Sequence, residues 1–437
     1  MTINRRRLLQ GSISCLAFGA LGSLSGCSTF LSTSNLKPDP MRVLDLPPGF
    51  SYTILQKKGA FMSDGYQVPG RSDGMASFPG QNNTLILMRN HELDHRQSDY
   101  SPTLSSQTRS KFYDPDGYGA VTRLVVDASS LQVVSSNLVL AGTSRNCAGG
   151  TSPWGWVSCE ENVDAGHGFA FLCRQHVNKL SEPIRLTSLG RFNREAFAFD
   201  SRTSISYMTE DRGDGCFYRF VPEHKNKPFA GGRLQAMMIV DAPAFNTKNN
   251  AQRYVDYQVV WVDIDDPVSE EDNCRFQGRE KGAALISRGE GLWLHNAELY
   301  FSATNGGLYE KGQIFQLTGL DQPENTLRLI SEAEDESALE FPDNLAVAPW
   351  GDLVIAEDGP WTDFIRMINR QGRVTTLARN ARSFKEITGV NFSPDGSILF
   401  MNMQHEGLTI AIKGPFKAYS QTAPENREGT WGRALSS

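Results

Sequence analysis

The sequence predicts an all-β fold, a six-bladed β-propeller with irregular insertions between its blades. The first observation is that no amphipathic segment beyond residue 48 has both the length and the periodicity of a helix. The second is that short runs of β-branched, aromatic and aliphatic residues alternate with Gly, Pro, Asn and Asp turns. The third is a pattern of turn, strand and polar cluster that occurs six times. Its irregular spacing is expected of blades that carry different insertions.

Each repeat consists of a turn, a predicted strand and a group of polar residues. In order along the chain, the repeats are residues 80–92, 150–162, 200–212, 291–307, 348–359 and 393–406. Segments typical of outer strands follow three of them, at residues 216–222, 312–319 and 363–374. The innermost strands of a propeller run side by side around a central channel, so their equivalent ends meet at one mouth. We therefore expect the polar clusters to face one another at that mouth.

The polar clusters bring many acidic groups together. They contain Asn90, Glu92, Glu160, Glu161, Glu210, Asp211, Glu357 and Asp358, with His91, Asn305, Asn402 and Gln404 nearby. Because carboxylates at close range repel one another, such a group must either be protonated or bind cations. Hard oxygen ligands at this density favour Ca²⁺ or Fe³⁺. A single cluster of this kind is typical of a solvated turn, whereas six matching strand ends favour a metal site.

The first 27 residues have the pattern of an export signal. Three arginines, Arg5 to Arg7, stand before two leucines and a mildly apolar stretch, which is typical of a twin-arginine signal. The stretch ends in Leu-Ser-Gly-Cys, similar to a lipoprotein cleavage box in which Cys27 is acylated; cleavage without a lipid is the alternative. We expect an exported protein, either periplasmic or held at a membrane by a lipid on Cys27, with the twin-arginine export machinery as a partner.

The rest of the sequence indicates one domain, and its charge and cysteines argue against some kinds of partner and site. We expect residues 28–48 to form an extended linker and residues 49–437 a single β-propeller catalytic domain. The formal net charge is −6 and no basic run follows the N-terminus, which argues against a nucleic-acid partner. Five cysteines remain after the signal, so at least one thiol is unpaired even where disulfides form. The sequence contains no CxxC pattern, so it gives no indication of a structural zinc site.

Nine motifs, in order through nearly all of the mature chain, resemble those of the PhoX-type alkaline phosphatases, an exported bacterial family. They are residues 72–78 (SDGMASF), 87–92 (LMRNHE), 146–161 (NCAGGTSPWGWVSCEE), 195–200 (EAFAFD), 207–212 (YMTEDR), 287–293 (SRGEGLW), 302–307 (SATNGG), 341–359 (FPDNLAVAPWGDLVIAEDG) and 389–404 (GVNFSPDGSILFMNMQ). The resemblance implies a six-bladed propeller that hydrolyses phosphate monoesters to inorganic phosphate with two Fe³⁺ ions and Ca²⁺ ions.

The resemblance also implies roles for individual residues. Cys147 resembles a thiolate ligand of iron, which would explain the unpaired cysteine, because a metal lowers the pKa of a thiol; a buried inert cysteine is the alternative. Arg288 and Glu195 are the candidate catalytic residues, with the arginine fork binding two phosphoryl oxygens. The implied metal ligands are Cys147, Glu195, Glu290, Asp343 and Glu357, with Glu161 or Glu160, and for calcium Asn90, Glu92, Glu210 and Asp211.

The sequence departs from the family pattern in two places. Trp156 follows Trp154-Gly155 at once, where the family has one more residue before the next aromatic. Strand side chains alternate between faces, so this shift leaves open which of Glu160 and Glu161 points into the channel. The chain is also short for the family, which leaves its substrate range open.

Three other functions are compatible with a propeller, because this fold serves many roles. One is a calcium-dependent lactonase or esterase, which needs one metal and no thiolate. Another is a phosphodiesterase, and the third is a non-catalytic binding or scaffold propeller at the cell envelope. Iron bound to Cys147 would colour the protein and so distinguishes the phosphatase from a calcium lactonase or a scaffold.

Overall fold

The computed structural model describes residues 35–94, 110–333 and 339–424. The predicted signal at residues 1–27, with Cys27, lies outside the described residues, as does the first part of the predicted linker. Leu44 and Asp45, from the rest of that linker, pair with a strand of the main body. In the part of the chain that the structure describes, no helix has the length and apolar character needed to cross a membrane.

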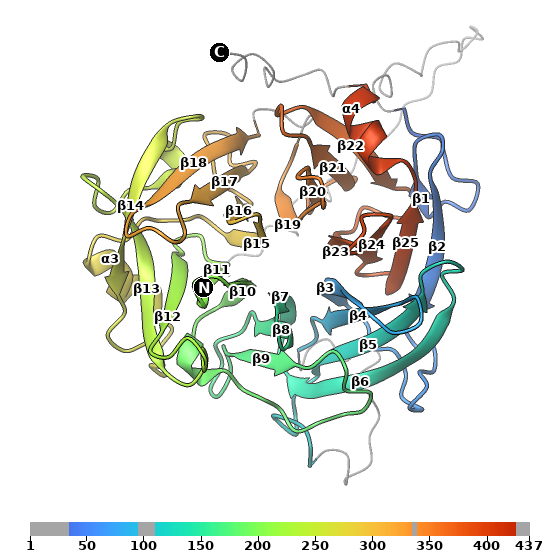
Figure 1. Cartoon of the computed structure of the whole chain (residues 1–437), viewed down its shortest axis with the longest axis horizontal. Helices are drawn as coiled ribbons and strands as arrows, with labels where there is room; N and C mark the ends of the chain where they lie inside the picture. The colour runs from blue at the N-terminus through green and yellow to red at the C-terminus, as the bar shows by residue number, and fades with distance from the viewer. Residues whose placement is uncertain (1–34, 95–109, 334–338, 425–437) are drawn as a thin grey trace, which may run out of the picture.

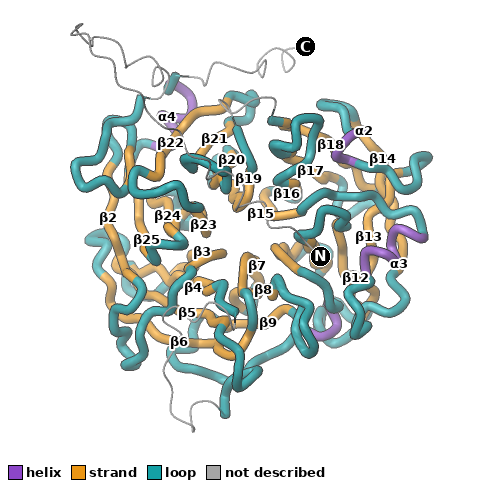
Figure 2. The backbone as a smooth tube through the Cα atoms, turned by 180° about the vertical axis from the view of Figure 1, so that it is seen from behind, coloured by secondary structure: helices purple, strands orange, loops and turns teal. Residues whose placement is uncertain are grey.

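The described residues form an all-β, propeller-like ring of five hydrogen-bonded sheets, which confirms the all-β class and the propeller-like arrangement of the prediction (Figure 1). Helices are short and lie at the periphery (Figure 2). They are the 3-10 helix η2 (Thr187–Leu189) and the α-helices α2 (Thr247–Asn250), α3 (Cys274–Glu280) and α4 (Phe416–Thr422). The predicted absence of long helices therefore holds for the described residues.

Three of the sheets are built from strands between residues 72 and 332. The first comprises β3 (Ser72–Pro79), β4 (Thr84–His91), β5 (Gly119–Asp127) and β6 (Val133–Thr143). The second comprises β7 (Asn146–Ser152), β8 (Gly155–Glu160) and β9 (Ala170–Cys173). The third has nine strands: β10 (Arg194–Asp200), β11 (Ile205–Glu210), β12 (Phe217–Pro222), β13 (Gly232–Ile239), β14 (Asp256–Asp263), β18 (Asn325–Glu332), β17 (Gln313–Thr318), β16 (Glu298–Ala303) and β15 (Gly289–His295).

The other two sheets close the ring. One, in spatial order, comprises β1 (Leu44–Asp45), β22 (Val374–Asn380), β21 (Phe364–Ile368), β20 (Leu353–Glu357) and β19 (Pro342–Val347). The other comprises β2 (Ser51–Lys57), β25 (Leu408–Lys413), β24 (Ile398–Met403) and β23 (Ile387–Phe392). N-terminal β1 and β2 thus complete sheets made of C-terminal strands, which ties the two ends of the described chain together.

The nine-stranded sheet consists of two antiparallel meanders that join at their outer strands. β14 pairs with β18 over four residue pairs, from Asp256 with Arg328 to Val259 with Asn325. Its two ends, β10 and β15, both lie at the centre of the ring (Figure 1). Among the described residues, six strands therefore surround the centre, each beside the next: β3, β7, β10, β15, β19 and β23.

The recurring strands of the sequence pattern are, with one exception, the second strands of their hairpins. β4, β8, β11, β20 and β24 each pair with the inner strand that precedes them in the chain. Our expectation that these strands line the channel was wrong. The inner strands escape detection because small residues and an irregular start interrupt their alternation. Since the hairpins are antiparallel, the end of each second strand lies at the same mouth as the start of its inner strand.

The hydrophobic core lies between neighbouring sheets. Met88 and Val121 of one sheet, for example, pack with Trp156 and Phe171 of the next. Each of these side chains is almost inaccessible to solvent, and such burial contributes ~1.5–3 kcal/mol for a large apolar side chain. This packing fixes the sheets side by side and so positions the starts of the inner strands.

Candidate metal centre

The six inner strands share one irregularity near their starts. Ser72 of β3 pairs with His91 while Met75 pairs with Arg89, so two residues of β3 lie opposite one residue of β4. This is a β-bulge, which disrupts the ladder and re-aims side chains. Equivalent shifts lie between Asn146 and Gly149, Arg194 and Phe197, Gly289 and Leu292, Pro342 and Leu345, and Thr388 and Asn391.

In five of the six strands the first bulged residue is of a type that binds metal ions well. These residues are Asp73, Cys147, Glu195, Glu290 and Asp343, and the sixth strand has Gly389 at this position. In four of these strands the next residue, Gly74, Ala148, Ala196 or Gly291, has no Cβ or only a methyl group because the neighbouring strand is close. A Cβ on Gly74 would lie 2.5 Å from the Cα of Ala148. The bulges therefore bring five potential ligands from five hairpins toward one centre.

Three groups of side chains could hold a metal ion. Within each group, ligand atoms from all members lie within 4.8 Å of one another. The groups are Cys147 with Glu161 and Glu195, Glu195 with Glu290 and Asp343, and Asp73 with Glu92 and Glu386. Glu195 belongs to two groups, so one carboxylate connects them. Below we call these three groups the thiolate group, the acidic group and the Asp73 group, in that order.

Polar side chains of adjacent second strands hold the backbone at the bulges. Each donates to the carbonyl oxygen of a potential ligand in the following hairpin. The pairs are Asn402 Nδ2 to Asp73 (2.7 Å), Asn90 Nδ2 to Cys147 (3.0 Å), Thr209 Oγ1 to Glu290 (2.7 Å) and Ser302 Oγ to Asp343 (2.8 Å). Bulged backbone lacks ladder partners, and buried carbonyl groups need a donor. These bonds therefore supply the missing partners and fix the ligands' backbone.

Burial controls the protonation of the clustered acids. Desolvation, followed by the charge of Glu161, raises the pKa of Glu195 well above its ordinary value, and burial does the same for Glu290. Burial and the charge of Asp211 raise the pKa of Glu161 to about 8, although Arg145 opposes the shift. Burial and nearby acids raise the pKa of the Cys147 thiol well above its usual range. These groups can all be charged together only if cations bind among them.

The donor set fits metal ions. Both carboxylate oxygens of Glu195 are buried and accept no hydrogen bond from any described residue, and the same is true of Asp73 Oδ1. Leaving a buried carboxylate without partners is costly, so these oxygens require a cation or a proton. Carboxylate oxygens suit Ca²⁺ and Fe³⁺, and a thiolate adds a ligand suited to iron. All five described cysteines are free, which leaves Cys147 available.

Arg288 lies at the edge of the acidic group. Its Nε and Nη2 donate to the two carboxylate oxygens of Asp211, at 2.8 and 3.1 Å, and Nη2 also donates to Glu290 at 2.7 Å. Two of the residues named from the sequence, Arg288 and Asp211, thus form a bidentate ion pair. The Arg288 side chain is 40% exposed, so part of the guanidinium faces solvent.

Glu160 and Glu161 have different surroundings. Glu161 belongs to the thiolate group. Glu160 accepts hydrogen bonds from His167 Nδ1 (2.7 Å) and from the backbone N–H groups of Ser144 (3.0 Å), Gly168 (2.9 Å) and Phe169 (3.1 Å). The Glu160 carboxylate therefore has its hydrogen-bond donors in the segments that flank β7 and β9, and it does not belong to any of the three groups.

Several other residues named from the sequence also have partners outside the three groups. Glu210 accepts from Cys216 N (3.0 Å) and the Tyr218 hydroxyl (2.9 Å). Glu357 accepts from Glu340 N (2.9 Å) and Arg366 Nε (2.9 Å). The Asn90 amide bonds the backbone beside Cys147 and accepts from Trp156. Of the calcium candidates named from the sequence, the three groups include Glu92 only.

Two members of the groups were missed from the sequence. Asp73 is one of them, although its motif was recognised. Its signal is a ligand-type residue followed by Gly or Ala at the start of a hairpin, as also at Cys147, Glu195 and Glu290. Glu386 precedes β23 and follows no such pattern, so only the fold reveals it.

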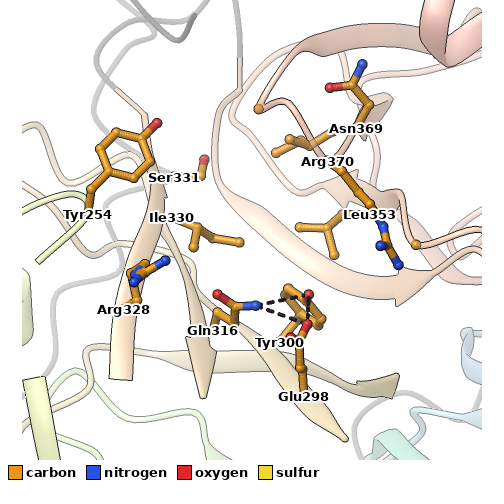
Figure 3. Close-up of a pocket in the computed structure, with 13 residues that line it drawn as sticks. Tyr254, Glu298, Tyr300, Gln316, Arg328, Ile330, Ser331, Leu353, Asn369 and Arg370 are labelled. Carbon is orange, nitrogen blue, oxygen red and sulfur yellow. Dashed lines mark hydrogen bonds between the residues drawn. The ribbon is translucent and has the colours of Figure 1, made fainter. Parts of the chain in front are cut away.

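A separate cavity of about 290 Å³ lies between the meander β15–β18 and strands β20 and β21 (Figure 3). Tyr254, Tyr300, Arg328 and Arg370 are among the residues that line it. No member of the three metal-binding groups lines this cavity, so it is not part of the candidate centre.

Comparison with known proteins gives one family match. The family model described as "Alkaline phosphatase PhoX" matches residues 31–139 and 131–407. No curated protein matches the chain.

Solved structures resemble the chain only distantly. A gluconolactonase from Xanthomonas campestris is 14% identical, with a TM-score of 0.40, over 84% of this chain and 99% of that chain. The Pan2 WD40 domain of Neurospora crassa is 9% identical, with a TM-score of 0.38, over 79% and 90%. Likenesses at this level carry no information about the reaction.

Proposed function

The chain belongs to the PhoX family of alkaline phosphatases, and from this premise we propose that it hydrolyses phosphate monoesters to inorganic phosphate with bound metal ions. One observation carries the proposal: the buried, unpartnered carboxylate of Glu195 connects two potential metal-binding groups, one of which contains a thiol. Adjacent metal ions that share ligands are typical of enzymes that transfer phosphoryl groups.

We assign Fe³⁺ to the thiolate group and the acidic group, and Ca²⁺ to the Asp73 group. The assignment rests on ligand chemistry, because Asp73, Glu92 and Glu386 offer only hard oxygen ligands, whereas Cys147 adds sulfur. When bound, such ions neutralise the charge of the phosphate and lower the pKa of the water that attacks phosphorus. Glu160, Glu210 and Glu357 stay out of the proposed ligand set, because none of them belongs to the three groups and each has donors or an arginine at its carboxylate.

Arg288 is proposed to bind the phosphoryl group. Its guanidinium sits between Asp211 and Glu290, and the Glu290 carboxylate belongs to the acidic group. A partly exposed arginine beside the metal-binding groups is suited to hold a dianion, because its planar fork matches two oxygens. The pKa of Arg288 is raised, since the attraction of Glu290 and Asp211 outweighs burial, so the side chain stays cationic.

We also propose the number of blades, the route of export and the start of the folded domain. We interpret the nine-stranded sheet as two blades joined at their edges, which supports a propeller of six blades. We also propose that residues 1–27 direct export and that the mature protein is periplasmic or anchored through Cys27. Its domain would then begin near residue 49. Expression with and without residues 1–27, followed by cell fractionation and mass analysis of Cys27, tests these proposals.

The central experiment combines metal analysis with a chromogenic phosphomonoester assay. We expect purified wild-type protein to contain iron and calcium, to be coloured by sulfur-to-iron charge transfer, and to release phosphate. Cys147→Ala should remove the colour and Arg288→Ala the activity, whereas Cys173→Ala, at a buried thiol away from the centre, should change neither. Wild-type protein without iron that is as inert as these variants would overturn the proposal. A colourless calcium protein that hydrolyses lactones would instead support the lactonase alternative, and diester hydrolysis would support the phosphodiesterase.

A further inference from the structure

Arg145 and Arg288 occupy the same place in their hairpins. Each is the residue immediately before an inner strand, β7 or β15. Each has left-handed backbone, with φ of 49° and 53° respectively. This conformation is uncommon for residues other than glycine and costs of order 1 kcal/mol or more. Arg71 before β3 (φ 50°) and Phe341 before β19 (φ 45°) share this backbone, so the conformation belongs to the start of these hairpins and gives Arg145 and Arg288 equivalent positions at the mouth.

The two arginines also use their donors in the same way. Arg145 Nε and Nη2 donate to Glu92, at 3.1 and 2.9 Å, and Nη2 also donates to Glu161. Arg288 uses Nε and Nη2 on Asp211, and Nη2 also on Glu290. In both side chains Nη1, with its two N–H donors, has no hydrogen-bond acceptor among the described residues. Each guanidinium therefore keeps donors for a ligand.

The two ion pairs lie next to each other at the mouth. Asn193 Nδ2 donates to Glu161 Oε1 at 3.1 Å and to the carbonyl oxygen of Asp211 at 2.9 Å. This amide links the Arg145 pair to the Arg288 pair. A continuous row of charged groups results, from Glu92 through Arg145 to Glu161 and then, across the Asn193 amide, to Asp211 and Arg288.

Exposure differs sharply between the cations and the acids of this row. The Arg145 and Arg288 side chains are 38% and 40% exposed, whereas those of Glu92 and Glu161 are each 9% exposed. The guanidinium groups therefore lie on the solvent side of the carboxylates. An anion that approaches this row from solvent therefore meets the two cations before Glu92 and Glu161, which favours its entry.

We propose that Arg145 is a second phosphate-binding residue, which together with Arg288 holds the phosphoryl group of the substrate at the mouth of the centre. This inference rests on the proposed phosphatase function and deepens it. Arg71, at the equivalent position before β3 with φ of 50°, has another role. Its side chain is only 18% exposed, and its Nη1 lies 2.8 Å from His405 Nε2. We assign it to positioning Glu92.

The test measures binding of inorganic phosphate to metal-loaded protein by calorimetry, with metal content determined for every sample. The variants are Arg145→Lys and Arg145→Gln, with Arg288→Lys for comparison. Arg202→Gln is the matched control, because Arg202 makes a similar bidentate pair with Asp200 at the opposite end of the β10–β11 hairpin. Loss of a charge-assisted bidentate contact should raise the dissociation constant for phosphate by roughly 10- to 100-fold in the Arg145 and Arg288 variants. The control should bind like wild type.

The outcomes separate this inference from the proposed function. Weaker phosphate binding at unchanged metal content supports a direct contact by Arg145. Unchanged phosphate binding in the metal-loaded fraction of Arg145→Gln overturns it, whether or not that variant loses metal, because Arg145 then serves only to hold Glu92 and Glu161. A wild-type protein that neither binds phosphate nor hydrolyses phosphate esters overturns the proposed function, and this inference with it.

Discussion

The side-chain hydroxyl of Thr209 donates to the carbonyl oxygen of Glu290 at 2.7 Å, across the boundary between two hairpins. The hydroxyl oxygen of Thr209 in turn accepts a hydrogen bond from the backbone N–H of Ala196 at 3.0 Å. One buried hydroxyl thus fixes the backbone beside Glu195 and at Glu290, two members of the acidic group. The proposed ligands are held by the neighbouring hairpin as well as by their own.

We therefore expect Thr209→Val to weaken metal binding without unfolding the protein. Valine has nearly the shape of threonine but cannot bond Ala196 and Glu290, and loss of such an outer contact typically costs 10- to 100-fold in metal affinity or activity. Iron content and phosphatase activity should fall together by about 10-fold. Thr209→Ser keeps the hydroxyl and should remain close to wild type. Equal metal content in Thr209→Val and wild type would contradict this role.

Replacing Glu160 and Glu161 separately should give opposite phenotypes. Glu160 accepts one side-chain and three backbone hydrogen bonds, so Glu160→Gln should lower the free energy of unfolding by roughly 2–4 kcal/mol. Glu161→Gln should leave stability in the presence of chelator near that of wild type, but lose iron and activity. Chemical denaturation with metal analysis measures both effects. Iron loss in Glu160→Gln with full stability would reverse the assignment.

Glu195→Gln should remove function while stabilising the metal-free protein. The buried carboxylate has no hydrogen-bond donor among the described residues, and a neutral amide is less costly to bury. In the presence of chelator, we expect the free energy of unfolding of the variant to be about 1–3 kcal/mol higher than that of wild type, so the variant is more stable. With metals present, it should lose activity by at least about 100-fold, since Glu195 belongs to both groups to which we assign iron. Denaturation curves with and without chelator measure whether the variant is more or less stable than wild type. A variant less stable than wild type in chelator would contradict the absence of a partner for the Glu195 carboxylate.

Metal removal should make stability depend on pH. The pKa of Glu161 is raised to about 8 and that of Asp343 to about 7 by burial and by acidic neighbours. In the unfolded chain both groups titrate near pH 4. Between these limits the folded metal-free protein binds more protons than the unfolded chain, so its stability falls as pH rises from about 4 to about 8.

The expected measurement is a series of melting temperatures between pH 5 and pH 8, with and without chelator. Chelated protein should melt at progressively lower temperature as pH rises. The stabilisation that metal adds should grow over the same range, because metal ions bind the deprotonated ligands. A chelator that leaves the melting temperature unchanged at pH 8 would show that these carboxylates do not depend on cations.

His167 should contribute a second, independent pH effect. Burial would lower its pKa, but hydrogen bonds and charge from Glu160 and Asp114 raise it above its ordinary value. A raised histidine pKa adds stability that is complete below about pH 6.5 and is lost as pH rises through the folded-state value. His167→Gln should remove this part of the pH dependence from metal-loaded protein. An unchanged pH profile of stability in that variant would contradict the ion pair.

Much of the centre was predictable from local pattern. Cys147, Glu195, Glu290 and Asp343 each stand in a recognisable motif, and the structure places them in the two groups that share Glu195. The turn and strand pattern also identified the second strand of most hairpins. The inner strands were not recognised, because bulges and small residues remove the alternation by which strands are detected.

The sequence by itself determined the family, the all-β class and which residue types are available for metal chemistry, because composition, turn signals and motifs are local properties. Only the tertiary structure separated Glu161 from Glu160, brought Asp73 and Glu386 to Glu92, and set Arg145 beside Arg288. Those relationships depend on bulges that redirect side chains and on hairpins that meet around one axis. No stretch of sequence contains that information, because the residues concerned lie on different hairpins.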